Sequence, residues 1–276
     1  MELIDCKRVR EEILDEVRGR NPGNLKLAII HVNGDDASEV YVRNKVKTAE
    51  SVGINAEVSV CSSDISLEGL KALIEMISEA PDVTGVMLQL PLPDHLKPYE
   101  RELLDIIPWY KDVDGLNSAS VGRLWSDLPC ITPATAEGVM RLLPYNLRGR
   151  KVTIINRSNL IGKPLIKLLL DRDATVTVCH SKTHDVRENT RNANIVITGI
   201  GKPNYFDWEI FDGQTWIDCG INRDKDGKLC GDVYLYYLRD KDVKVTPVPG
   251  GVGILTTAQL MLNVIKANEY QEEVKL

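Results

Sequence analysis

The chain has 276 residues, enough for one large or two modest domains with a substantial buried core. Its 34 Lys and Arg residues against 40 Asp and Glu residues give a net charge of −6 and an isoelectric point near 5.4. This balance argues against a protein that coats nucleic acid, because phosphate binding needs a basic surface and no run of basic residues supplies one. Apolar residues at 43% and charged residues at 27% are typical of a globular chain and exclude a disordered one.

No segment is long and apolar enough to predict a membrane-spanning helix. LAIIHV and GVMLQLPLP are short apolar runs, whereas a spanning helix needs roughly 20 such residues. The N-terminal MELIDCKRVREE becomes charged too early for a signal peptide, so we expect a cytoplasmic protein. The six cysteines and four histidines have no metal-ligand spacing, which predicts reduced thiols and no metal site.

Short β-rich runs alternate with longer helical ones, which predicts an α/β protein with two βα-rich halves. In the first half we expect helices near 37–52 and 66–80, and strands at 25–32, 56–60 and 84–90. In the second half we expect strands at 151–155, 174–179, 194–198, 215–219 and 243–247. The halves should separate between the irregular stretch 108–133 and Lys151. The last helix, about 256–270, could pack on either half.

The first of these helices carries a candidate catalytic lysine. Asp36 can cap the helix, with Glu39 completing a capping box. Tyr41 and Lys45 are four residues apart and therefore lie together, beside an apolar stripe formed by Val42, Val46 and Ala49. A lysine at the margin of an apolar face is a candidate for a lowered pKa and for proton transfer. A surface lysine stacked over a tyrosine is the simpler alternative.

Polar residues that follow the strand at 84–90 are candidates for a ligand site. Gln89 lies at its carboxyl end, the edge where α/β folds bind ligands, although it could also be an ordinary exposed amide. The segment IPWYKDVDGLN places Asp112 and Asp114 in a loop before Gly115. Either aspartate could simply form the turn, or it could accept two hydrogen bonds from an amidine-like edge of a heterocycle.

Residues 149–183 have the strand, turn, helix, strand order of a mononucleotide-binding half, in which the pyrophosphate rests on the helix N-terminus. Gly162 opens the predicted helix. The G-x-G-x-x-G fingerprint is absent, since Asn156 and Ser158 stand where glycines are expected. The motif by itself is therefore weak evidence for dinucleotide binding.

The residues after the second strand of this unit favour a phosphorylated cofactor. His180, Ser181 and Lys182 stand where an NAD enzyme usually has a carboxylate for the ribose hydroxyls. Together with Arg157 they make a cationic, hydroxyl-rich corner that suits a 2′-phosphate. Solvated surface charges are the alternative interpretation. Further on, PVPGGVG at 247–253 allows close backbone approach to a ligand, or forms a tight turn.

Taken together, these segments resemble the methylenetetrahydrofolate dehydrogenase/cyclohydrolase family over nearly the whole chain. The matching segments fall in the family's order and include DDASEVYVRNKVKTAESVGI, GVMLQLPLP, KDVDGLN, GRKVTIINRSNLIGKP, ATVTVCHSKT and VTPVPGGVG. The resemblance implies an α/β fold of two domains with a cleft between them. A folate domain would comprise 1–137 and 257–276, with the final helix returning to it, and a Rossmann-type NADP-binding domain would comprise 138–256.

The resemblance also implies roles for individual residues. Lys45 would be the catalytic lysine, Tyr41 would stack on the pterin, Gln89 would be the polar partner of the lysine, and Asp114 would grip the pterin's amino edge. Pro249, Gly250 and Gly251 would contact the folate as well. The NADP-binding residues would be Asn156, Arg157, Ser158, Ile161, Gly162, Lys163, Pro164, His180, Ser181, Thr183, Gly199, Ile221, Gly251, Val252 and Gly253.

The chain departs from the family pattern at three places. The usual P-C-T-P-x-G reads PATAEG, so that Ala134 and Ala136 replace a cysteine and a proline. Asn156 replaces the usual glycine before the R-S pair, and Ile254 replaces a proline. The two alanines and Ile254 put the shape of the cleft in question, and Asn156 puts in question how closely the cofactor approaches.

The resemblance implies oxidation of 5,10-methylenetetrahydrofolate with NADP, followed by hydrolysis of the methenyl product to 10-formyltetrahydrofolate. It implies tetrahydrofolate derivatives as substrates, a homodimer and a role in one-carbon metabolism and purine biosynthesis. Nucleic acid and membrane partners are not expected. Two alternatives stay open: a shikimate dehydrogenase-like oxidoreductase, against which the YVRNK and QLPLP segments speak, and a non-catalytic folate or nucleotide sensor, for which a titrating lysine is unnecessary.

Overall fold

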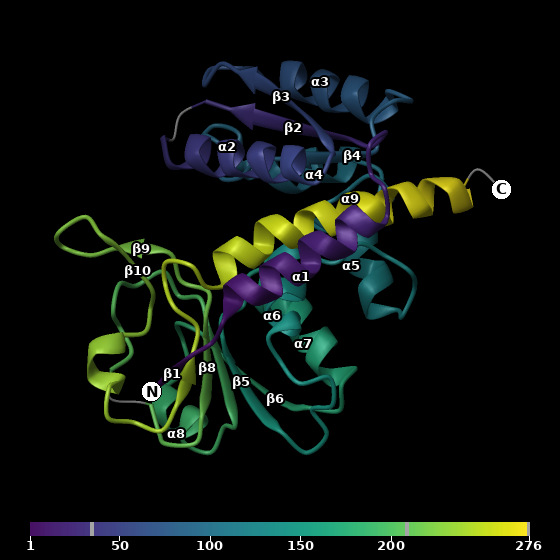
Figure 1. Ribbon diagram of the computed structural model, residues 1–276. Helices are drawn as coiled ribbons and strands as arrows, with labels where there is room; N and C mark the ends of the chain where they lie inside the picture. The colour runs from purple at the N-terminus through teal and green to yellow at the C-terminus, as the bar shows by residue number, and fades with distance from the viewer. Residues whose placement is uncertain (34–35, 208–209, 275–276) are drawn as a thin grey trace. The chain divides into compact units, whose positions relative to one another are not determined.

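The computed structural model describes residues 1–33, 36–207 and 210–274 (Figure 1). They form two compact units. Unit 1 comprises Met1–Glu11 and Thr135–Thr256, and unit 2 comprises Glu12–Ala134 and Thr257–Leu276. Each unit is an α/β structure built around its own parallel sheet, as the alternation of strands and helices in the sequence predicts.

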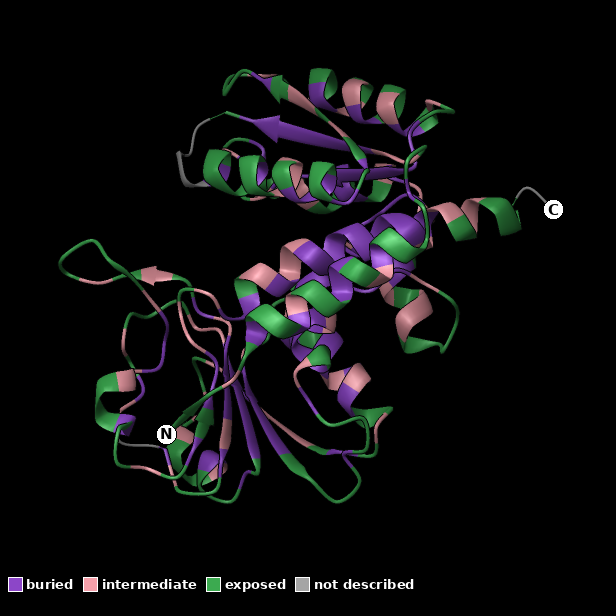
Figure 2. Cartoon of the chain, in the orientation of Figure 1, coloured by how far each residue is buried: buried purple, intermediate pink, exposed green. Residues whose placement is uncertain are grey.

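Unit 2 contains a three-stranded parallel sheet in the order β3-β2-β4. The strands are β2 (Lys26–Val32), β3 (Asn55–Cys61) and β4 (Gly85–Leu88), which confirms the three strands expected in the first half. The central strand β2 is buried from Leu27 to Val32 (Figure 2). Its near-continuous apolar run reflects burial on both faces, which is usual for a parallel sheet.

The two helices expected in the first half agree with α2 (Asp36–Ser51) and α3 (Leu67–Glu79) to within a few residues. Four further helices were not predicted: α1 (Cys6–Gly19, which begins in unit 1), the short 3-10 helix η1 (Lys97–Tyr99), α4 (Glu100–Ile106) and α5 (Ser118–Trp125). At the start of α3, the Ser66 side chain accepts a hydrogen bond from the Gly69 N–H, a standard N-cap. The capping box predicted for Asp36 involves a side chain outside the described residues.

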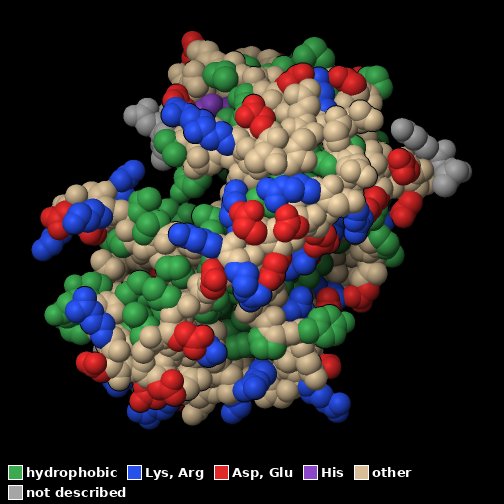
Figure 3. Space-filling view, in the orientation of Figure 1, with side chains coloured by type: hydrophobic (Ala, Val, Ile, Leu, Met, Phe, Trp, Pro, Cys, Tyr) green, Lys and Arg blue, Asp and Glu red, His purple; other side chains and the backbone are tan. Residues whose placement is uncertain are grey.

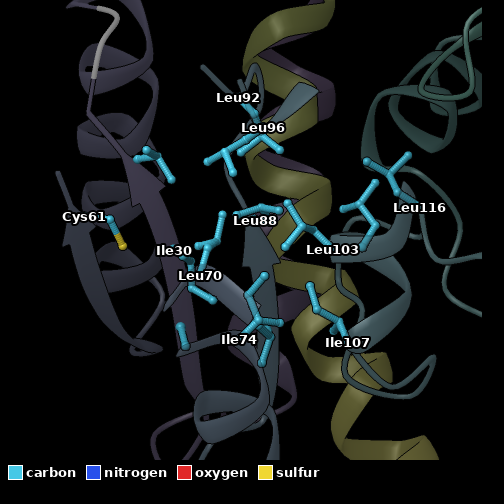
Figure 4. Packing of buried hydrophobic residues seen from close by; sticks show 14 of the residues in the cluster. Ile30, Cys61, Leu70, Ile74, Leu88, Leu92, Leu96, Leu103, Ile107 and Leu116 are labelled. Carbon is cyan, nitrogen blue, oxygen red and sulfur yellow. The ribbon is translucent and has the colours of Figure 1, made fainter. Parts of the chain in front are cut away.

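One face of this sheet forms the main core of unit 2 (Figure 4). Ile30 of β2 and Leu88 of β4 are neighbours in register, and they belong to one buried cluster in which Ile30 lies beside Leu70 of α3 and Leu88 beside Leu103 of α4. Because side chains alternate along a strand, Leu27, Ile29 and His31 point to the opposite face. The two faces therefore divide the unit into an apolar core and a side that bears polar groups near the strand ends.

Unit 1 contains a six-stranded parallel sheet in the order β1-β11-β8-β7-β5-β6. Its strands are β1 (Glu2–Leu3), β5 (Lys151–Ile155), β6 (Thr175–Cys179), β7 (Ile195–Thr198), β8 (Thr215–Asp218) and β11 (Lys244–Val245). Counted from β5, five strands have the doubly wound order 2-1-3-4-5. The order reverses between β5 and β7, so their carboxyl ends flank the topological switch point, where such sheets bind ligands.

Helices and loops cover this sheet on both faces. Its other elements are α6 (Ala134–Arg141), α7 (Gly162–Leu170), α8 (Val186–Arg191), the hairpin of β9 (Asn222–Arg223) and β10 (Leu229–Cys230), and η2 (Leu235–Leu238). Ile154 and Ile197 belong to one buried cluster with Leu165 of α7, whereas Val196 and Trp216 belong to a second. The five strands expected in the second half are confirmed.

The last helix, α9 (Val252–Val274), is longer than the sequence predicts, and most of it belongs to unit 2. A Cβ on Gly85 of β4 would lie 3.7 Å from Val264, so the helix packs on this strand. Asn263 donates hydrogen bonds from Nδ2 to the carbonyls of Val113 (2.8 Å) and Thr132 (3.0 Å). These contacts show that most of α9 packs on the first half of the chain, in unit 2.

The surface is charged and mixed. On the face shown in Figure 3, basic and acidic side chains are interspersed rather than gathered into a field of one sign. No helix in the described part of the chain combines the length and apolarity that crossing a membrane requires. Within those same residues, no cluster of three or more His, Cys, Asp or Glu side chains has the arrangement of a metal site.

Candidate active site

In unit 2, the structure joins Lys45 of α2 to Gln89, which directly follows β4. The Lys45 Nζ donates a hydrogen bond of 2.8 Å to the Gln89 Oε1. The Gln89 backbone N–H donates to the carbonyl of Ile30, which continues the β2–β4 ladder by one residue, and its side-chain amide donates to the carbonyl of Leu90. Gln89 is buried and held at both ends, so it presents its oxygen to the lysine in a fixed position.

Asp114 is brought to the same edge by a backbone bridge. Asp112 pairs in parallel with Val86 of β4, so the loop passes β4 in the direction of the strand. The charge of Asp114 acts on Lys45, and that of Lys45 acts on Asp114. The hydrogen bond from the Asn263 Nδ2 to the carbonyl of Val113 holds this loop against α9. Two segments separated by about seventy residues therefore supply one cation and one anion to a single site.

The structure gives different partners to Asp112 and Asp114, the two loop aspartates that the sequence alone could not distinguish. The Asp112 Oδ2 accepts hydrogen bonds from the Asn117 N–H (2.8 Å) and the Ser120 hydroxyl (2.9 Å), and its side chain is fully buried. Asp112 is therefore the turn-forming residue. Asp114 has no such local partners among the described residues and faces Lys45 instead.

Burial and mutual attraction act in opposite directions on the pair. Loss of water lowers the pKa of Lys45 because burial disfavours the ammonium, and the negative charge of Asp114 offsets part of this shift. Burial likewise raises the pKa of Asp114, and Lys45 offsets part of that shift. A lysine with a lowered pKa spends more of its time as a neutral amine near pH 7. It can then accept a proton as well as return one.

The protein's stability should depend on pH through Asp112. Burial raises the pKa of this carboxyl to about 7, against about 3.9 in an unfolded chain. Between these values the folded state holds the extra proton, so the contribution of Asp112 to stability falls as the pH rises from about 4 to about 7. Asp112→Asn removes this titration. We expect urea unfolding to show the stability of the parent relative to the variant falling across that window, whereas parallel pH profiles would contradict the assignment.

Tyr41 and His31 complete the surroundings of Lys45. Tyr41 lies one turn before Lys45 on α2 with its side chain exposed. His31 was not singled out from the sequence. The register of β2 and β4 places it beside Gln89 on the same face, with 3% of its surface exposed and neither ring nitrogen hydrogen-bonded to any described residue. The alternation of LKLAIIHV could have indicated its face, but not its neighbour.

In unit 1, the predicted phosphate-binding residues gather at the carboxyl ends of β5 and β6. Ile155 and Cys179 are partners in register, so Arg157 and Ser181 each follow their strand by two residues. Both side chains are exposed. Ser181 lies in the turn 180–183, which is closed by a hydrogen bond of 2.9 Å from the His180 N–H to the Thr183 hydroxyl. A guanidinium and a hydroxyl at this edge, with no carboxylate after β6, fit the 2′-phosphate of NADP.

The other predicted cofactor residues lie in the loops and the first helical turns that follow the strands of this sheet. Gly162, Lys163 and Pro164 form the first turn of α7, directly after Ile161. Gly199 follows β7, and Ile221 precedes the β9–β10 hairpin. Val252 and Gly253 open α9.

The glycines of the segment 247–253 are largely accounted for by the turn itself. Gly250 has a φ of +90°, and a Cβ on Gly251 would lie 2.1 Å from the carbonyl oxygen of Pro247. Side chains are therefore excluded at both positions whether or not a ligand binds.

Ala134 and Ala136, which depart from the family pattern, are buried in α6, and Ile254 lies in the first turn of α9.

These observations define a class of protein. Unit 1 is a doubly wound dinucleotide-binding fold whose sheet edge suits a phosphorylated cofactor. Unit 2 carries a half-buried lysine held by an amide and faced by a carboxylate. The combination is typical of an NADP-dependent enzyme that has a second, polar site.

Comparison with known proteins identifies the family. Residues 4–114 match the model for the tetrahydrofolate dehydrogenase/cyclohydrolase catalytic domain, and residues 133–272 match that for the NAD(P)-binding domain of the same family. A bifunctional protein FolD from Moorella thermoacetica is 40% identical, with 96% of this chain and 98% of that protein covered. The chain therefore belongs to the tetrahydrofolate dehydrogenase/cyclohydrolase family.

Solved structures agree with this assignment. The bifunctional methylenetetrahydrofolate dehydrogenase/cyclohydrolase of Campylobacter jejuni has a TM-score of 0.92 at 36% identity, with 98% of this chain and 99% of that chain covered. The Trypanosoma brucei enzyme, solved with NADP and an inhibitor, has a TM-score of 0.87 at 30% identity, with coverage of 99% and 98%. A shikimate dehydrogenase shares only the fold, at 8% identity and a TM-score of 0.51.

The chain is accordingly a bifunctional enzyme of one-carbon metabolism. It oxidises 5,10-methylenetetrahydrofolate to 5,10-methenyltetrahydrofolate with NADP, and it hydrolyses that product to 10-formyltetrahydrofolate. Membership of this family excludes both alternatives that the sequence left open, the shikimate dehydrogenase-like enzyme and the non-catalytic sensor.

Proposed function

We propose that Lys45 is the proton-transferring group of the hydrolytic step, with Gln89 and Asp114 as its partners in unit 2. The observation that carries this proposal is the 2.8 Å hydrogen bond from the Lys45 Nζ to the buried Gln89 amide, beside the charge of Asp114. The amide fixes the amine in place, and burial lowers its pKa toward the range in which it can exchange protons.

In the hydrolytic step, water adds to the cationic methenyl carbon and one carbon–nitrogen bond of the ring then breaks. The added water must lose both of its protons to become the formyl carbonyl, and the departing nitrogen must gain one, so one proton is released to solvent overall. The neutral amine of Lys45 takes the first proton and returns one to the nitrogen, so that the amine is regenerated. Gln89 keeps the amine in reach through both transfers.

We propose that Asp114 and Tyr41 position the pterin. A carboxylate accepts two parallel hydrogen bonds from an amino group and the adjacent ring N–H, and the exposed ring of Tyr41 offers a stacking surface one turn from Lys45. Pro249, Gly250 and Gly251 are proposed as further folate contacts. In the oxidation the main task of these residues is to hold the methylene carbon at a fixed place and angle.

For the oxidation, NADP supplies the acceptor of the hydride that leaves the methylene carbon. We propose that Arg157 and Ser181 bind its 2′-phosphate, an assignment supported by their paired positions after β5 and β6. The remaining proposed cofactor contacts are Asn156, Ser158, Ile161, Gly162, Lys163, Pro164, His180, Thr183, Gly199, Ile221, Gly251, Val252 and Gly253.

Asp114→Asn tests the role of the carboxylate. The variant keeps the shape of the side chain but loses its charge and one acceptor position, so we expect the KM for methylenetetrahydrofolate to rise by roughly 10–100-fold, the effect of a lost hydrogen bond to a charged group. The KM for NADP should stay within about twofold. Both values come from a spectrophotometric assay of NADPH formation with methylenetetrahydrofolate and NADP.

Asp82→Asn is the matched control, because Asp82 forms an exposed ion pair with Lys26 in the same unit and such pairs contribute little. An unchanged folate KM in Asp114→Asn would rule out the proposed contact. Absence of NADPH formation by the parent protein would instead contradict the oxidation itself.

Several wider features remain proposals. They are functional domain boundaries at 1–137 with 257–276 and at 138–256, a cleft between the two domains, a homodimer, a cytoplasmic location and a contribution to purine biosynthesis. Family membership supports them. Analytical ultracentrifugation would test the homodimer directly.

A further inference from the structure

The side chain of Asn156 ties together three segments of unit 1. Its Oδ1 accepts hydrogen bonds from the backbone N–H groups of Ser158 (2.7 Å) and Gly162 (3.1 Å), and its Nδ2 donates to the carbonyl of Gly199 at 2.5 Å. One amide thereby joins the end of β5, the start of α7 and the loop after β7. We call this set of three hydrogen bonds the Asn156 latch.

The latch crosses the topological switch point of the sheet. Ile155 and Thr198 are register partners at the ends of β5 and β7, so Asn156 and Gly199 are the first residues beyond two neighbouring strands. In doubly wound sheets the ligand binds at this place, because the loops from adjacent strands diverge there. The hydrogen bond from Asn156 to Gly199 spans the point where the loops would otherwise separate.

The first N–H groups of α7 are engaged by the chain itself. The Ile161 N–H donates to the Ser158 hydroxyl (3.0 Å), and the Lys163 N–H donates to the Ser158 carbonyl (3.0 Å). Gly162 donates to Asn156, and Pro164 has no N–H group. A helix N-terminus commonly offers such groups to a phosphate. Here the loop residues Asn156 and Ser158 already satisfy them.

Packing around Gly162 is matched to this arrangement. A Cβ at Gly162 would lie 2.3 Å from the Asn156 carbonyl oxygen and 2.8 Å from its Oδ1, so any side chain there would force the helix away from the latch. A Cβ at Gly199 would lie 3.4 Å from the Asn156 Nδ2. That distance is an ordinary contact, so Gly162 is the glycine that the approach of the asparagine requires, and Asn156 is the residue that departs from the family's glycine.

We propose that Asn156 is a positioning residue for NADP. The latch fixes the loop that presents Arg157 and Ser158 and holds the N–H groups of α7 in internal hydrogen bonds. The charge of the cofactor diphosphate is then met by a side chain, for which the exposed Lys163 in the first turn of α7 is the nearby cation, while Arg157 stays with the 2′-phosphate. This inference rests on the proposed cofactor contacts of unit 1 and adds the means by which their loop keeps its shape.

Asn156→Ala tests the latch. Loss of the three hydrogen bonds should raise the KM and the Kd for NADP by about tenfold, equivalent to about 1.4 kcal/mol. The kcat of oxidation at saturating NADP should stay within about twofold of that of the parent, because the loop is then held by the bound cofactor. Asn146→Ala is the matched control. Asn146 is an exposed asparagine of unit 1 that precedes β5, at the other end of the strand from Asn156, and its side chain accepts from the Arg148 N–H, so its removal should leave NADP binding unchanged.

A second measurement does not depend on the variant. In the parent protein without cofactor, the Gly162 amide should be protected from hydrogen exchange, and its protection should persist when NADP is added. Exchange at the rate of an unbonded amide, or a direct contact of this N–H with the diphosphate in a complex with NADP, would overturn the proposal. So would an NADP affinity of Asn156→Ala within twofold of the parent. A parent that fails to bind NADP at all would contradict the cofactor assignment instead, while the exchange result would still report on the latch.

Discussion

Lys45→Met should reduce the hydrolysis of methenyltetrahydrofolate by roughly 10²–10⁴-fold, the usual effect of losing a positioned acid–base group. Methionine keeps most of the length and the apolar stem of lysine, so α2 should pack as before. Methionine cannot donate a hydrogen bond to Gln89, and it cannot carry a proton between water and the departing nitrogen. The rate is measured from the disappearance of the methenyl absorbance, with the spontaneous reaction subtracted.

Lys47→Met provides the control, because Lys47 lies on the same helix with an exposed side chain. It should hydrolyse the substrate at the parental rate. NADP binding, measured by fluorescence, should be the same in both variants and in the parent, since unit 1 contains the proposed cofactor residues. Parental hydrolysis by Lys45→Met would show that the proton transfers pass through another group.

Arg157→Ala should lower kcat/KM for NADP by about 10–100-fold and leave kcat/KM for NAD almost unchanged. The difference between the two cofactors is the 2′-phosphate, and a charge-assisted hydrogen bond to a phosphate contributes about 1.5–3 kcal/mol. Ser181→Ala should act in the same direction with a smaller effect, because a hydroxyl supplies a hydrogen bond without a charge. Steady-state kinetics with both cofactors measures the ratio.

Arg148→Ala is the matched control for this experiment. Arg148 is an exposed arginine that precedes β5, at the opposite edge of the sheet from Arg157. A general loss of positive charge would affect both variants, whereas a phosphate contact affects only Arg157. Equal losses with NADP and NAD would contradict the assignment of Arg157 to the 2′-phosphate.

Periodicity predicted the long elements well and missed several of the short ones. The strands of LKLAIIHV and KVTII and the helix opened by Gly162 have patterns that span a whole element, and the structure confirms them. The two-residue strands β1, β9 and β10 carry no such pattern. β1 forms through pairing with β11, a partner more than two hundred residues away, which no local signal reveals.

The site could be predicted only in part for a related reason. The rule that polar residues at strand ends face ligands selected Gln89, and the helix spacing selected Tyr41 with Lys45. The contact between Lys45 and Gln89 depends on where α2 packs, so the resemblance to a family was needed to predict it. Asp112 and Asp114 were indistinguishable in the sequence because both fit a turn before glycine. Only the hydrogen bonds made by Asp112 separate them.

Asn156 shows the limit of interpreting a departure from a family pattern. From the sequence, a side chain in place of glycine suggests an obstacle to the cofactor. In the structure the side chain is directed into hydrogen bonds with its own loop and with Gly199. Because Gly199 follows a different strand, its position depends on the register of β5 and β7 and not on the local sequence.

The division of α9 between the two units constrains how the protein is made. Neither unit corresponds to one continuous stretch of chain, since unit 2 requires residues from Thr257 onward and unit 1 requires the first eleven residues. During synthesis, the carbonyls of Val113 and Thr132 are made 150 and 131 residues before Asn263, the residue that donates hydrogen bonds to them. Unit 2, which bears Lys45, can therefore be completed only after α9 has been made, and a fragment truncated before α9 would lack these contacts.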